Sequence, residues 1–201
     1  MEWKVKKVEQ ETSHSFLNFV TVTYDVTKLD GNHYDYEYFM ATRHDKDHIL
    51  PVTKDYSRPD GVTIPLYYVD EEGKVSVLLT SQFRPAVGRR VTSIPAGLLD
   101  EGDTDIKEAA RREALEEAGA VIADLEVLAP TGTTSSGLSD ETNAIVLGRI
   151  VSFKEKNLED FEDIDSRLYS LDEVKEMLKD DKYLFALNVR LILLYLLERF
   201  K

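Results

Sequence analysis

Three glutamates within one short run are the residues of this chain best suited to chemistry. Glu113, Glu116 and Glu117 lie in the segment EALEE, past the middle of the 201-residue sequence. At about 100° per residue, a helix would place them within an arc of roughly 100°. Converging carboxylates need a cation, and oxygen ligands with no Cys or His nearby suit hard ions such as Mg²⁺ or Mn²⁺. The run therefore predicts a divalent metal site that acts on phosphate groups.

A helix from about Asp105 to Gly119 would position these carboxylates. Asp105 followed by Glu108 resembles a capping box, and glycine at position 119 is typical of a helix C-cap. The glutamates lie next to the apolar side of this helix and not on the opposite, solvent-facing side. We therefore expect them to point into a cleft. The alternative is an ordinary solvated helix in which Arg112 forms i,i+4 ion pairs with Glu108 and Glu116.

The segment from residue 97 to residue 120 resembles the Nudix box, G-x5-E-x7-R-E-U-x-E-E-x-G-U, in which U is an aliphatic residue. The matching residues are Gly97, Arg112, Glu113, Ala114, Glu116, Glu117, Gly119 and Ala120. Two positions depart from the signature: Asp103 replaces the usual glutamate, and eight residues instead of seven separate it from Arg112. The insertion precedes or falls in the first helical turn, so the spacing of the glutamates is kept. We therefore expect Asp103 to serve the loop or the helix cap.

Resemblance to the Nudix hydrolases implies an α/β fold, in which an α/β/α sandwich surrounds a mixed β-sheet. It also implies that Glu113, Glu116, Glu117 and the backbone carbonyl of Ala96 bind two or three Mg²⁺ or Mn²⁺ ions. By the same resemblance Arg112 orients the carboxylates of the box. A box glutamate such as Glu116 is one candidate for the group that accepts the proton of an attacking water.

The residues that flank the box resemble the ADP-ribose pyrophosphatase branch of this family. QFRP, which contains Arg84, and SIPAG, which ends at Gly97, are similar to runs that precede the box, although Ser93 stands where glutamate is common. Arg84 and Gly97 are thereby implied to lie at the substrate. A later run, SGLSDE, ends at Glu141, where the family has a glutamate that is proposed as the general base.

The N-terminal residues predict a β-rich extension. Residues 16–26 and 34–42 alternate as strands do, on either side of the turn LDGN. We expect residues 1–54 to form this β-hairpin extension and residues 55–201 to form the Nudix domain. Resemblance to the branch implies that the extension pairs with its twin in a homodimer, and that Arg43 contacts the ligand. The aromatic face of the hairpin is expected to be core or an oligomer interface, or to stack on a purine.

Further elements follow from periodicity and capping signals. His33, His44 and His48 lie in or near turns and show no ligand spacing, so we expect them to be ordinary surface histidines. The loop DYSRPDG at residues 55–61 is expected to mark the boundary between the extension and the main domain. The expected strands are 62–69, 74–83, 123–129, 143–151 and 160–170, and the expected helices are 170–180, which has a capping box, and 185–200.

Composition excludes several classes of function. Twenty-five Lys and Arg residues against 38 Asp and Glu residues give a formal net charge of −13, which disfavours binding to nucleic acid or to an anionic membrane. The chain has no cysteine, no apolar run long enough to span a bilayer and no signal-peptide core near its start. We therefore expect a cytoplasmic protein.

The expected activity is Mg²⁺-dependent hydrolysis of the diphosphate bond in a nucleoside diphosphate linked to a sugar. The motifs around the box favour ADP-ribose, which would give AMP and ribose 5-phosphate. The alternatives are another nucleotide-sugar, such as ADP-glucose or GDP-mannose, and a Nudix domain that senses a ligand without cleaving it. A structural interaction protein that works through its aromatic hairpin is a third possibility.

Overall fold

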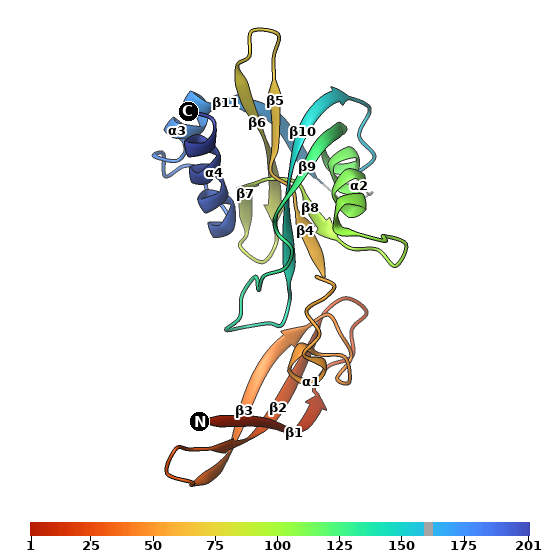
Figure 1. Ribbon diagram of the computed structural model, residues 1–201, viewed down its shortest axis with the longest axis vertical. Coiled ribbons are helices and arrows are strands. Elements are labelled where there is room, and N and C mark those ends of the chain that lie inside the picture. The colour runs from red at the N-terminus through yellow and green to blue at the C-terminus, as the bar shows by residue number, and fades with distance from the viewer. Residues whose placement is uncertain (159–162) are drawn as a thin grey trace. The chain divides into compact units, whose positions relative to one another are not determined.

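The computed structural model describes residues 1–158 and 163–201, and the chain divides into two compact units (Figure 1). The first unit contains Met1–Asp60 and also Thr131–Asn143. The second unit contains Gly61–Pro130 and Ala144–Lys201. The segment Thr131–Asn143 therefore belongs by its contacts to the N-terminal unit, although it joins two strands of the other unit.

The first unit is built on a three-stranded antiparallel sheet in the order β1-β2-β3. Its core is a small cluster of buried residues that includes Val20, Val22, Met40 and Ile49. The predicted hairpin is present as β2 and β3, whereas β1 was not expected, since its mostly exposed, charged residues give little sign of a buried face. The elements are β1 (Glu2–Gln10), β2 (Asn18–Thr27), β3 (His33–Thr42) and the short helix α1 (Leu50–Thr53).

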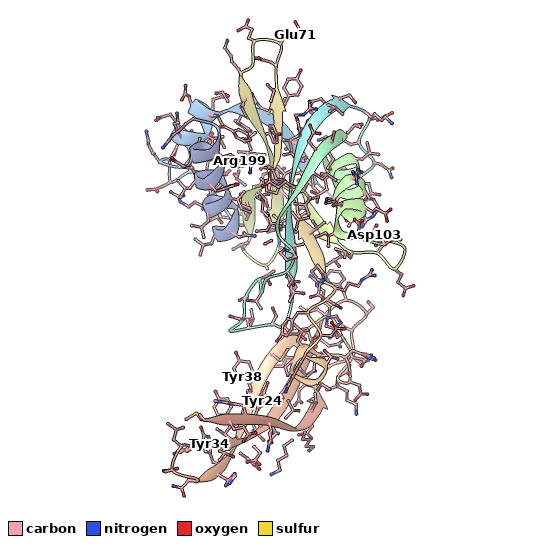
Figure 2. All side chains as sticks on the ribbon, in the orientation of Figure 1. Tyr24, Tyr34, Tyr38, Glu71, Asp103 and Arg199 are labelled. Atoms are coloured by element: carbon pink, nitrogen blue, oxygen red, sulfur yellow. The ribbon has the colours of Figure 1, made fainter. Side chains whose placement is uncertain are left out.

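Aromatic side chains from all three strands of this sheet contact one another. The Trp3 ring meets Tyr24 and Tyr36 edge-on, with centroid distances of 5.6 Å and 5.5 Å, and Tyr38 stacks beside Tyr36 at 6.4 Å. Figure 2 labels Tyr24 and Tyr38 on this sheet. Trp3 remains 47% exposed and Tyr36 40% exposed, so this aromatic face is only partly covered within the chain.

The second unit contains an eight-stranded mixed sheet whose main path is β11-β6-β5-β10-β4-β8. β7 pairs with β6 and β9 pairs with β10, while β10 and β5 run parallel. The strands are β4 (Gly61–Thr63), β5 (Leu66–Val69), β6 (Val75–Arg84), β7 (Arg89–Ser93), β8 (Ala96–Leu98), β9 (Ala120–Ala129), β10 (Asn143–Phe153) and β11 (Ile164–Ser170), and the helices are α2 (Ile106–Ala118), α3 (Leu171–Met177) and α4 (Leu187–Arg199).

Helices cover both faces of this sheet, which confirms the predicted α/β/α arrangement around a mixed sheet. One apolar core contains the buried alanines of α2 packed against residues such as Val62 and Val146. A separate core contains Val174 of α3 and Leu193 of α4. Figure 1 shows α2 on one side of the strands, and α3 and α4 on the other. In the described part of the chain, no helix is long and apolar enough to cross a membrane.

Several strand boundaries differ from the sequence prediction. The strand expected at 62–69 is two strands, β4 and β5, interrupted next to Pro65, which has no amide hydrogen to donate. β7 and β8 were not expected as separate strands, because five and three residues carry little periodicity. The start of the strand expected at 160–170 lies outside the described residues, and the strand observed there begins at Ile164.

A partly buried ion pair ties the segment Thr131–Asn143 into the first unit. His44 Nε2 lies 2.8 Å from Asp60 Oδ1, whose side chain is only 9% exposed. The other oxygen, Asp60 Oδ2, accepts hydrogen bonds from Thr142 N at 2.7 Å and Thr142 Oγ1 at 3.0 Å. The hydrogen bond with Asp60 raises the pKa of His44, with smaller contributions from the charges of Asp140 and Asp45. His44 is thus a structural histidine and not the plain surface residue that its sequence context suggested.

We expect His44→Gln to remove a pH-dependent part of the stability of the first unit. Because the pKa of His44 lies above 6.5 in the folded chain, its pairing is fully stabilising below pH 6.5 and is lost as the pH rises through the raised value. The difference in unfolding free energy between parent and variant should be up to about 1 kcal/mol at acidic pH and shrink with rising pH. Urea unfolding followed by the fluorescence of Trp3, the chain's single tryptophan, measures it.

His48→Gln is the matched control, because His48 pairs with Asp45 in a largely exposed contact. Its unfolding free energy should follow that of the parent across the same pH range. Equal pH dependence in the parent and in His44→Gln would contradict a stabilising pair.

Candidate active site

Local capping fixes both ends of the helix α2, which carries the box glutamates. Asp105 is the N-cap, and its carboxylate accepts hydrogen bonds from Lys107 N at 2.6 Å and Glu108 N at 3.0 Å. Gly119 ends the helix with φ of 63°, a conformation that favours glycine. Both predicted ends are observed, but Glu108 bonds to Thr104 N at 3.0 Å instead of closing a capping box with Asp105.

Two of the three box glutamates are almost fully buried. Glu113 is 9% exposed and Glu117 8% exposed, on the same side of α2 as its buried alanines, whereas the Glu116 side chain is 35% exposed. Glu117 Oε2 accepts a hydrogen bond from Ala96 N at 3.1 Å. A Cβ atom at Gly97 would lie only 2.0 Å from the carboxylate of Glu113. The carboxylates therefore point at β8, and glycine at position 97 leaves the space that Glu113 fills.

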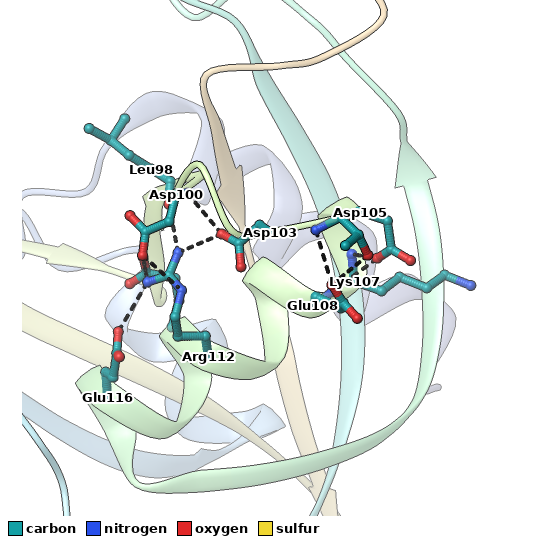
Figure 3. Close-up of polar contacts among 10 residues, drawn as sticks. Leu98, Asp100, Asp103, Asp105, Lys107, Glu108, Arg112 and Glu116 are labelled. Carbon is teal, nitrogen blue, oxygen red and sulfur yellow. Dashed lines mark hydrogen bonds and ion pairs between the residues drawn. The ribbon is translucent and has the colours of Figure 1, made fainter.

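Arg112 joins two of these carboxylates to the loop that precedes the helix (Figure 3). Its Nη1 atom donates to Glu113 Oε1 at 2.7 Å and to Glu116 Oε2 at 3.1 Å. Its Nη2 atom donates to the carbonyl of Leu98 and to Asp103 Oδ2, both at 2.9 Å. Burial lowers the pKa of Arg112, but the hydrogen bonds with Asp103 and Glu113 outweigh this effect and raise the pKa above its ordinary value. Arg112 is therefore a permanent cation that holds the acidic cluster together.

Asp103, the residue that departs from the box signature, supports the loop as expected and also contacts Arg112. Its carboxylate is 9% exposed and accepts from Asp100 N at 2.8 Å as well as from Arg112. The extra residue before the helix therefore leaves an acidic partner for Arg112 in place. Asp100 adds an ion pair with Arg112 Nε at 3.3 Å.

The chemical type of the donors in this cluster suits a hard divalent cation, although the side chains are not gathered around a single point. Burial raises the pKa of Glu113, an effect that Arg112 partly offsets. A bound cation would stabilise the same carboxylate, and all side-chain donors here are oxygens. Within the described residues, no three His, Cys, Asp or Glu side chains are arranged closely enough to hold a metal ion. Arg112 donates hydrogen bonds to Glu113 and Glu116, and the amide of Ala96 donates one to Glu117. These carboxylate oxygens are therefore bonded to protein groups.

Glu141 and Arg43 lie together in the first unit. Arg43 Nε donates to Glu141 Oε2 at 2.8 Å, and Thr134 Oγ1 donates to Glu141 Oε1 at 3.0 Å. The Arg43 guanidinium also lies over the ring of Phe16, at 4.4 Å from its centroid. The structure thus brings the predicted base and one predicted substrate contact into direct contact with each other.

Arg84 is placed at the end of β6, opposite Arg89 of β7. Its side chain is exposed. Ala96 and Gly97 lie in β8, next to α2. Their roles toward substrate and metal, like that of Arg84, stay predictions.

Sequence reasoning missed two sets of supporting contacts. The carbonyl of Leu98 and the carboxylate of Asp100 both contact Arg112, and the acidic loop DEGD could have indicated such a partner. The pairing of His44 with Asp60 has no sequence signal, because the two residues belong to different loops.

Comparison with known proteins agrees with this fold. Residues 58–187, more than half of the chain, match the NUDIX domain. The chain is 34% identical over 152 residues to an uncharacterized Nudix hydrolase of Schizosaccharomyces pombe. The aligned region covers 69% of this chain and 70% of that protein. The chain belongs to the Nudix hydrolase family.

Two further proteins are similar to it. A Caenorhabditis elegans protein named as nudix hydrolase 2 is 34% identical to this chain over 88 residues. The aligned region covers 44% of this chain and only 39% of that relative's length. A crystal structure described as an ADP compounds hydrolase has a TM-score of 0.64 at 16% identity, over 90% of this chain and 84% of the other. At that identity the likeness is one of fold.

We expect Gly97→Ala to displace Glu113 and weaken Mg²⁺ binding while the chain still folds. The added methyl group would meet a carboxylate, which is the flexible end of a side chain and can move aside. Calorimetric titration with Mg²⁺ should show about tenfold weaker binding or more, consistent with the loss of one ligand. Gly102→Ala is the control, because a Cβ there meets no atom within 4 Å. Parent-like Mg²⁺ binding by Gly97→Ala would contradict the expectation that Gly97 leaves the space in which Glu113 binds the metal.

Proposed function

We propose that this protein is a divalent-metal-dependent hydrolase of nucleoside diphosphates linked to a sugar. Its proposed substrate is ADP-ribose, and the products are AMP and ribose 5-phosphate. The observation that carries the proposal is the buried pair Glu113 and Glu117 in a chain of the Nudix family. Arg112 bonds to Glu113, and Ala96 N of β8 bonds to Glu117. The flanking runs QFRP and SGLSDE favour ADP-ribose. A structure of similar fold is described as a hydrolase of ADP compounds, which agrees with this choice.

The residues that would hold Mg²⁺ are Glu113, Glu116, Glu117 and the carbonyl of Ala96. When bound, the metal would offset the charge of the diphosphate and lower the pKa of a water molecule. Burial of two of these carboxylates supports this assignment, because a desolvated carboxylate gains more from a nearby cation than an exposed one does. Arg112 would orient Glu113 and Glu116 without touching the substrate.

The remaining predicted residues would bind the substrate or move a proton. Glu141, or else Glu116, would accept the proton of the attacking water. The exposed guanidinium of Arg84 could bind a diphosphate or ribose oxygen in bidentate fashion. Arg43 would contact the ligand, and Gly97 would let it approach the backbone of β8.

We also propose that the first unit pairs with a second copy of itself. The support is its aromatic face, on which Trp3 and Tyr36 keep 47% and 40% of their surface exposed. Rings so exposed on a sheet are suited to an interface between subunits.

The proposal is tested by chromatography of ADP-ribose incubated with the protein and Mg²⁺, with a chelator in the control. AMP and ribose 5-phosphate should appear only when the metal is present. Cleavage of ADP-glucose or GDP-mannose in place of ADP-ribose would keep the reaction and change the sugar. Calorimetric binding of ADP-ribose without cleavage would instead identify a sensing domain.

We expect Glu117→Gln to lower turnover by about 100-fold or more, because the neutral amide is a poor metal ligand. Stability should change by no more than about 1 kcal/mol, since the amide oxygen can still accept the hydrogen bond from Ala96 N. Steady-state turnover and urea unfolding measure the two effects. Glu176→Gln, which alters an exposed pair with Lys179 on α3, should match the parent in both. Parent-like turnover of Glu117→Gln would exclude it from the metal site.

A further inference from the structure

The segment Thr131–Asn143, which carries Glu141, is a loop closed at its base by backbone hydrogen bonds. Asn143 N donates to the carbonyl of Gly132 at 2.8 Å, and Thr134 N donates to the carbonyl of Glu141 at 3.1 Å. At the tip, Ser139 N donates to the carbonyl of Ser135 at 2.9 Å. We name residues 131–143 the Glu141 loop. Its backbone is internally paired on both sides of the tip, so it can move as one piece unless other residues anchor it.

Two anchors lie on the N-terminal side of Glu141. Ala41 N, on β3, donates to the carbonyl of Leu138 at 2.9 Å. Asp140 is 7% exposed, and its Oδ2 atom accepts a hydrogen bond from Leu50 N at the first residue of α1. The tip of the Glu141 loop and the residue before Glu141 are thus attached to the N-terminal sixty residues.

The anchor on the other side is Asp60. Its two carboxylate oxygens have different partners. Oδ1 pairs with His44, and Oδ2 accepts hydrogen bonds from both the amide and the hydroxyl of Thr142. In return Asp60 N donates to the carbonyl of Thr142 at 3.1 Å. Burial raises the pKa of Asp60, but hydrogen bonds from His44 and Thr142 outweigh this effect and hold the pKa below its ordinary value. The carboxylate is thus ionised, and its two bonds to Thr142 are charge-assisted, which strengthens this anchor.

We infer that Asp60, oriented by His44, is a positioning residue for the reaction, because it fixes the backbone directly after Glu141. The inference rests on the proposed function, in which Glu141 accepts the proton of the attacking water. Asp60 touches no substrate in this account. It holds Thr142 while Asp140 holds the preceding residue, so the Glu141 backbone is fixed from both sides.

The carboxylate of Glu141 is itself directed by Arg43 and Thr134. These contacts orient the side chain only if the backbone beneath it is fixed. A shift of the backbone by about 1 Å can lower the rate of a chemical step by about 100-fold. A binding role would alter KM, whereas loss of this anchor should act on kcat, since the misplaced group is needed after the substrate is bound.

The experiment compares Asp60→Ala, Asp60→Asn and the parent, all as full chains. For Asp60→Ala we expect kcat on ADP-ribose to fall by about 10-fold to 100-fold with KM changed less than about threefold. Hydrogen exchange at the amides of Ala41 and Thr142 should become faster. Asp60→Asn should recover part of both losses, because its amide oxygen can still accept from Thr142.

Asp55→Asn is the matched control, because Asp55 is an aspartate of the same unit whose carboxylate accepts from the nearby Ser57 amide and not from the loop. It should match the parent in kcat and in exchange. If Asp60→Ala fails to fold, which faster exchange throughout β2 would reveal, Thr142→Val supplies the test by removing only the hydroxyl that bonds to Asp60.

Each outcome separates the two proposals. Unchanged kcat in a folded Asp60 variant whose loop exchanges faster overturns the positioning role and leaves the hydrolase proposal standing. Unchanged loop exchange in Asp60→Ala shows that Asp60 does not anchor the loop. Loss confined to KM would assign Asp60 to substrate binding instead. An inactive parent overturns the proposed function, and the catalytic role of Asp60 with it.

Discussion

The structure of the second unit depends on how like charges are kept beside an apolar core. Glu113 and Glu117 are buried on the alanine side of α2, where water cannot screen them. Arg112 compensates for this by bonding to Glu113 and Glu116 and to the loop before the helix. Removing one partner of such a group leaves a buried charge unpaired, which is far more costly than losing an exposed ion pair. The helix caps, the acidic loop and the small residues of β8 all serve this arrangement.

Sequence reasoning predicted the helix and its ends because the signals there are local. The cap at Asp105, the stop at Gly119 and the spacing of the glutamates lie within one short segment, and each has a direct physical cause. It also predicted the layered α/β fold and the N-terminal hairpin. It missed β1, β7 and β8, since their short or charged sequences show no buried face until the neighbouring strands are in place.

The contacts that sequence reasoning could not supply join residues far apart in the chain. Arg43 and Glu141 were both singled out, but nothing in their separate motifs shows that they bond to each other. Asp60 was assigned only to a boundary loop, and His44 to an ordinary surface position. Their pairing, and their hold on Thr142, depend on the tertiary structure of the first unit. Local patterns identify groups able to do chemistry, whereas tertiary contacts decide how those groups are held.

The assignment of Thr131–Asn143 to the N-terminal unit also constrains the order in which the chain can fold. Asp60 and Thr142 are separated by 82 residues, and Arg43 and Glu141 by 98. During synthesis the N-terminal sheet emerges from the ribosome first, but its contacts with this segment cannot form until the strands up to β9 have been made. Contacts between such distant residues close large loops and form slowly. The sheet of the first unit is therefore translated before the second unit, but the first unit cannot be completed until translation has reached Asn143, when much of the second unit has already been made.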